Sequence, residues 1–135
     1  MKCGEVYYWT SDQAKGHDVR DKYHVYIGEG DWRHQGHVFL FINKSNAHGN
    51  GYEITKPPYD FLKLLRSYVS CGDHAEYGDD VVPPKIGPCL GRLGPAHRAE
   101  LRRTVDASDV MATYTQELVC AALDAAAPLR RPKTG

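Results

Sequence analysis

Short apolar runs, separated by turn-forming residues, make up the first two thirds of the chain. The runs with strand-forming composition are residues 5–9, 23–27, 37–42, 51–55 and 68–71. The third run is apolar at five successive positions, from Val38 to Ile42, which predicts a central strand covered on both faces. A last strand over 86–93 would be interrupted by Gly87 and Pro88. This pattern predicts a small, strongly curved antiparallel sheet or a partly closed barrel.

Helical periodicity replaces the strand pattern after Gly94. A proline opens a predicted helix over 95–104, and a second helix is predicted over 108–126. Its expected apolar stripe consists of Val110, Met111, Tyr114, Leu118 and Ala122. A brief helix over 59–65 is also expected after two prolines. Together these elements predict an α+β fold.

The length and charge narrow the class of protein. The 135 residues fit one domain, expected over 1–127, followed by a basic flexible tail over 128–135. The chain has 17 Lys and Arg against 17 Asp and Glu, which excludes a protein that coats polyanions indiscriminately. Residues 85–103 nevertheless hold five basic side chains against one acidic one. A local contact with nucleic acid remains compatible with the neutral total.

Neither a membrane span nor a disulfide framework is expected. The longest apolar stretch is far shorter than the ~20 residues that cross a bilayer, and residues 1–5 do not open a secretory leader. The cysteines lie far apart at positions 3, 71, 89 and 120. We therefore expect free thiols and a cytoplasmic location.

Three polar segments are candidates for chemistry. The loop 15–22 can bind phosphate or move a proton, although its charges can equally pair with one another. The residues of this loop that could carry such chemistry are Lys15, His17, Asp18, Arg20 and Lys22. The turn 43–46 can bond to a phosphate or a base, or simply end a strand. Residues 70–74 place Cys71 near His74, as two metal ligands or as a thiol beside a base. No second ligand pair has finger spacing, so we expect no metal ion.

The order of these segments resembles the MazF/PemK family of toxin endoribonucleases. The segment Gly4–Trp9 resembles the opening strand of that family. Residues 15–27 look like its Gly-x-Glu-Gln-x-Gly-x-Arg-Pro loop and second strand, with Lys22-Tyr23 where the family has Arg-Pro. Residues 37–45 look like its third strand and the turn that follows. Further similarity covers 67–73 and the closing strand and helix over 86–104.

The resemblance implies an SH3-like, CcdB/MazF-like barrel with peripheral C-terminal helices, and a homodimer. It also implies cleavage of single-stranded RNA without a metal ion or other cofactor, controlled by an antitoxin protein. In this chemistry the RNA 2′-hydroxyl attacks the adjacent phosphate, which requires a base, an acid and cations. The catalytic candidates are His17, Asp18, Lys22, Asn43 and Ser45. The RNA-binding candidates are Lys15, Arg20, Lys44, Ser70 and Asp73.

Two other classes of function stay open. A non-catalytic member of the same fold would bind nucleic acid or a protein partner, and Ser70 favours this reading because some family members carry arginine there. An assembly protein would instead dock a partner through the last helix. Its signature would be an unpaired apolar stripe at Val110, Met111, Tyr114 and Leu118.

Overall fold

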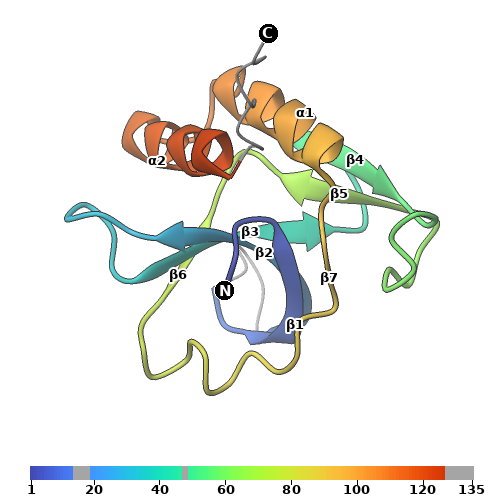
Figure 1. Cartoon of the computed structure of the whole chain (residues 1–135), viewed down its shortest axis with the longest axis horizontal. Coiled ribbons are helices and arrows are strands. Elements are labelled where there is room, and N and C mark those ends of the chain that lie inside the picture. Colours follow the sequence, from blue (N-terminus) through green and yellow to red (C-terminus); the bar gives the residue numbers. More distant parts are fainter. Residues whose placement is uncertain (14–18, 47–48, 127–135) are drawn as a thin grey trace, which may run out of the picture.

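Seven strands form one curled antiparallel sheet, and two helices pack against one of its faces (Figure 1). The computed structural model describes residues 1–13, 19–46 and 49–126. The strands are β1 (Glu5–Ser11), β2 (Arg20–Glu29), β3 (His37–Asn43), β4 (Gly51–Thr55), β5 (Arg66–Ser70), β6 (Ala75–Tyr77) and β7 (Gly91–Arg92). Their order is β4-β5-β3-β2-β1-β7, and β6 also pairs with β3. The prediction of an α+β fold built on a curved antiparallel sheet is therefore confirmed.

Strand β3 lies at the centre of the sheet and serves two cores. Its neighbours are β2 on one edge and both β5 and β6 on the other. Alternate side chains point to opposite faces of a strand. Val38, Leu40 and Ile42 accordingly join the core beneath the helices, while Phe39 and Phe41 join a second, aromatic core. This double burial confirms the reading of 37–42 as a central strand.

The two helices are α1 (Pro95–Asp106) and α2 (Thr113–Ala125). Helix α2 begins five residues later than expected, and the face that it buries carries Thr115, Val119 and Leu123. Tyr114, which we expected in the buried stripe, is 43% exposed. The side chain of Gln116 explains this rotation, because its Nε2 donates to backbone carbonyls at the end of α1 and in the connection that follows.

Two other expectations about secondary structure are wrong. Residues 59–65 form turns between β4 and β5 and not a helix, since Tyr59 is held by its hydroxyl against Gly94 N and Leu65 is 68% exposed. Within 59–65 only Tyr59 and Leu62 are buried, which is too little apolar surface to offset the nucleation cost of so short a helix. Strand β6 lies outside all of the predicted strand runs, and it forms because Ala75 and Tyr77 alternate into the aromatic core.

The N-terminal strands extend further than their apolar runs. Strand β2 already begins at Arg20, within the segment 15–22 that we expected as a loop. The predicted last strand over 86–93 is reduced to Gly91–Arg92. All four cysteines are free, as expected. Within the described ranges, neither helix is long and apolar enough to cross a membrane.

Candidate functional site

The register between β2 and β3 brings Lys22 and Asn43 together. Tyr23 pairs with Ile42, so the preceding lysine and the following asparagine meet at the end of the ladder. Lys22 Nζ donates a hydrogen bond to Asn43 Oδ1 at 2.6 Å. The ammonium also lies 5.5 Å from the centre of the Phe41 ring, within the range of a cation–π contact. Two residues that are 21 positions apart in sequence thus form one polar contact.

Other charged residues surround this contact. Partial burial lowers the pKa of Lys22, and repulsion from Arg20 and Lys44 lowers it further, while Asp73 opposes the shift. Arg20 and Lys44 are both exposed. Two further cations therefore act on one half-buried amine, and the carboxylate of Asp73 opposes their effect.

Ser70 and Asp73 bind each other at the end of β5. The Ser70 hydroxyl is part of a buried residue and donates to Asp73 Oδ1 at 2.5 Å. This contact fixes the carboxylate that faces Lys22 electrostatically. Ser70 and Asp73 were both predicted to bind RNA. In the structure the Ser70 hydroxyl is bonded to Asp73, and the negative charge of Asp73 acts on Lys22.

The remaining predicted site residues are of two kinds. Ser45 lies exposed in the turn after β3. Lys15, His17 and Asp18 lie outside the described residues. The structure consequently gathers Arg20, Lys22, Asn43, Lys44, Ser70 and Asp73 in one region.

His24 supports this region from below, a role that the sequence did not indicate. Its ring stacks on Trp9 with 3.4 Å between centroids, and its Nδ1 lies 2.9 Å from the carbonyl oxygen of Lys22. Because a carbonyl only accepts, Nδ1 carries the proton, and Nε2 accepts from the Tyr77 hydroxyl at 2.9 Å. Burial lowers the pKa of His24 to about 3, so the ring is neutral near pH 7. His24 is thus a fully buried, packed residue.

A groove beside β1 is distinct from the cationic region. It is lined by Trp9, Thr10 and Tyr77, and its charged residues are Asp12, Asp21, Glu76, Asp80 and Lys85. Among the lining residues that the structure describes, four carboxylates stand against one lysine, which makes this part of the groove acidic. It is therefore unsuited to a phosphate backbone, although it lies close to the strand that carries Lys22.

Only part of the basic segment 85–103 is a free cationic surface: Lys85, Arg92 and Arg103 are exposed, whereas the other two arginines are engaged within the fold. Arg98 is buried, and its Nη1 donates to the carbonyl oxygen of Leu93 at 2.5 Å. Arg102 pairs with Asp106 at 3.4 Å and with Asp124 at 3.2 Å. These two arginines hold α1 to its neighbours, so the local excess of charge in the sequence overstates what is available to nucleic acid.

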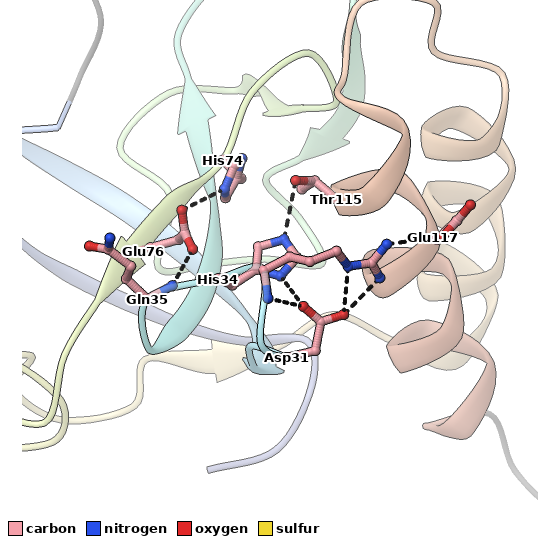
Figure 2. A network of polar contacts seen from close by, with 8 residues as sticks. Asp31, His34, Gln35, His74, Glu76, Thr115 and Glu117 are labelled. Atoms are coloured by element: carbon pink, nitrogen blue, oxygen red, sulfur yellow. Dashed lines mark hydrogen bonds and ion pairs between the residues drawn. The ribbon is translucent and has the colours of Figure 1, made fainter.

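A second polar cluster lies between the sheet and α2, and Figure 2 shows it at close range. His74 Nε2 is 3.1 Å from Glu76 Oε2, and the ring of His34 lies 5.7 Å from that of His74, centre to centre. The thiol of Cys71, which we considered as a partner of His74, is instead fully buried against Val69 O. The sequence analysis missed His34 and Glu76, because they come from separate segments of the chain.

Comparisons with known proteins leave the family open. No protein-family model matches this chain, and no curated protein matches it significantly. The resemblance to the MazF/PemK toxins is thus a prediction from the order of the sequence segments. The antitoxin partner, the homodimer and the cytoplasmic location that went with it also stay predictions.

Proposed function

We propose that the chain is an endoribonuclease that binds single-stranded RNA at the region around Lys22 and cleaves it by attack of the 2′-hydroxyl. The contact between Lys22 and Asn43, with Arg20 and Lys44 beside it, is the observation that carries this proposal. Phosphate groups bind to such sets of cations and amides.

The proposed division of roles follows from the geometry of the contact. Lys22 would bind a non-bridging oxygen of the scissile phosphate and stabilise the extra negative charge of the pentavalent intermediate. Asn43 accepts from Lys22 through its oxygen, which leaves the amide nitrogen as a donor to a second phosphate oxygen. Arg20 and Lys44 would hold the neighbouring phosphates, and Ser45 would contact the same strand from the exposed turn.

Proton transfer is assigned to His17 and Asp18. A histidine titrates near neutrality and can act as a base toward the 2′-hydroxyl or as an acid toward the leaving 5′-oxygen. His24 cannot take this role, because both of its ring nitrogens are occupied and its pKa is about 3.

The test uses a single-stranded RNA with a fluorescent label, in buffer with EDTA. Wild type is compared with Lys22→Met and with the control Lys56→Met. Lys56 is exposed and follows the end of β4 that pairs with Arg66, whereas Ser70, near Lys22, pairs with the other end of β4. We expect Lys22→Met to reduce the cleavage rate by about 100-fold or more. Lys56→Met should cleave like wild type, and a DNA strand of the same sequence should stay intact because it lacks the nucleophile. No cleavage by wild type, or equal cleavage by wild type and Lys22→Met, would refute the proposal.

A non-catalytic RNA-binding module is the second candidate. It is favoured by Asp73, the carboxylate near Lys22, which is already bonded to Ser70. This alternative predicts RNA binding without cleavage. In that case Lys22→Met would weaken binding and lower the slope of log affinity against log salt by about 0.7, the value of one phosphate contact on a single strand.

A further inference from the structure

The second polar cluster contains three side chains that can each offer one ligand atom to a metal ion. The ligand atoms of His34, His74 and Glu76 all lie within 4.8 Å of one another. Two segments supply them: the loop between β2 and β3 holds His34, and the stretch that leads into β6 holds His74 and Glu76. In Figure 2 the side chains of His74 and Glu76 contact each other and His34 lies beside them, with its ring nitrogens toward Asp31 and toward Thr115 at the start of α2.

His34 is oriented by a carboxylate on its far side. Asp31 Oδ1 accepts from His34 Nδ1 at 2.8 Å. Arg33 holds this carboxylate from its other side, with Nη2 donating to Asp31 Oδ2 at 2.7 Å. The proton of the imidazole is thereby placed on Nδ1, and the lone pair of Nε2 accepts from the Thr115 hydroxyl at 3.2 Å, a hydrogen bond that a metal ion would replace. A carboxylate behind a histidine in this way is the usual outer partner of a metal-binding imidazole.

Glu76 and the surrounding backbone are positioned with similar support. Glu76 Oε1 accepts from the backbone N–H of Gln35 at 2.6 Å, which leaves Oε2 toward His74. The main chain of Glu76 is held in turn by both ends of the Gln13 amide, at 2.6 and 3.0 Å. A hydrogen bond from Gly30 N to Gly36 O, 2.7 Å long, closes the loop that carries His34.

We propose that His34, His74 and Glu76 bind one divalent transition-metal ion, and that this ion is Zn²⁺. Two imidazoles and one carboxylate are borderline ligands that suit zinc, and they leave a fourth tetrahedral position for water. Zinc bonds of about 2.0–2.1 Å place tetrahedral donor atoms roughly 3.4 Å apart, so ligand atoms that now lie within 4.8 Å of one another need to approach by about 1.4 Å at most. The ion replaces two hydrogen bonds, that between His74 and Glu76 and that between His34 Nε2 and Thr115.

The bound ion ties together segments that are far apart in the sequence. It connects the loop around His34 to β6, and it lies next to Thr115, whose Oγ1 is 3.2 Å from His34 Nε2. A ligand that binds only the folded chain raises its stability. The proposed role is therefore to stabilise this end of the sheet against α2, a role that does not depend on RNA cleavage.

The experiment measures Zn²⁺ binding by calorimetry, on protein without an affinity tag that has been stripped with a chelator and dialysed. We expect one ion per chain and a rise in melting temperature on adding Zn²⁺. The variants His34→Gln and Glu76→Gln should each lower the affinity by 100-fold or more. Asp31→Asn should lower it by about 10- to 100-fold, the usual effect of losing an outer partner. Circular dichroism checks that each variant is folded.

His37 provides the matched control. It also contacts a carboxylate, with its Nε2 3.2 Å from Asp79 Oδ1, but it lies outside the cluster of ligand atoms. The affinity of His37→Ala should equal that of wild type. No binding by wild type, or binding that His34→Gln and Glu76→Gln leave unchanged, would overturn the assignment, the second result by placing the ion elsewhere on the chain.

Discussion

The buried histidine of β2 makes the stability of the protein depend on pH. His24 is 0% exposed, and burial lowers its pKa from the ordinary 6.5 to about 3. In the unfolded chain the imidazole binds a proton as the pH falls below about 6.5, whereas in the folded chain it stays neutral until about pH 3. The unfolded state therefore binds more protons between these values, and the folded state loses stability as the pH falls through them.

The size of the effect follows from the two pKa values. Each pH unit inside the window is equivalent to about 1.4 kcal/mol. Acidification from pH 7.5 to pH 5 should then lower the free energy of unfolding by about 2 kcal/mol through His24 alone. The carboxylates whose pKa is lowered by their partners, Glu5 and Asp31, ordinarily titrate at 4.5 and 3.8, so their contribution to acid unfolding begins below this range.

Urea unfolding followed by circular dichroism at several pH values between 5 and 7.5 measures this slope. The control is His24→Gln, which removes the titrating group, retains every other histidine and keeps an amide oxygen as an acceptor for Tyr77. We expect the variant to be less stable at pH 7.5 and to lose about 2 kcal/mol less than wild type on acidification. Equal pH dependence of the two proteins would refute the reasoning.

Two further predictions concern a glycine and the cysteines. Gly36 has φ of +112°, and a Cβ there would collide with the carbonyl oxygen of Tyr77. In urea unfolding, Gly36→Ala should therefore lower the free energy of unfolding by about 2 kcal/mol or more. The control Gly28→Ala, whose new Cβ meets open space, should lower it by less than about 1 kcal/mol. Cys71 is 0% exposed, and burial raises its pKa to about 12, whereas Cys89 is exposed. A thiol reagent at pH 8 should therefore label Cys89 much faster than Cys71. Equal labelling rates of the two thiols in the folded protein would contradict this prediction.

Local sequence was a sound guide wherever one periodicity dominated. The apolar run ending at Ile42 predicted a doubly buried strand, and β3 is that strand. Gly94-Pro95 predicted the start of α1 correctly. The errors came where contacts with other segments decide the conformation. The buried positions of α2 are displaced by one residue from the predicted apolar stripe, because the side chain of Gln116 binds the end of α1. A contact between two helices cannot be predicted from the spacing of residues within one of them.

The two candidate sites differ in how much of each could be foreseen. The sequence singled out Lys22 and Asn43 as chemically suitable residues, but their meeting depends on the register of β2 against β3. For the second polar cluster the sequence offered His74 alone. The spacing of His74 and Glu76, two positions apart, was the one local signal that they could share a face.

The sequence by itself determined the α+β class, the central strand and the presence of polar loops able to contact phosphate. Only the tertiary structure decided which charges are free to act. It buried Arg98, joined Arg102 to two carboxylates and left Arg20 and Lys44 exposed around Lys22. The physical reason is that a charge interacts with whatever lies within a few ångströms of it, and strand pairing sets those distances between residues that are far apart in the chain.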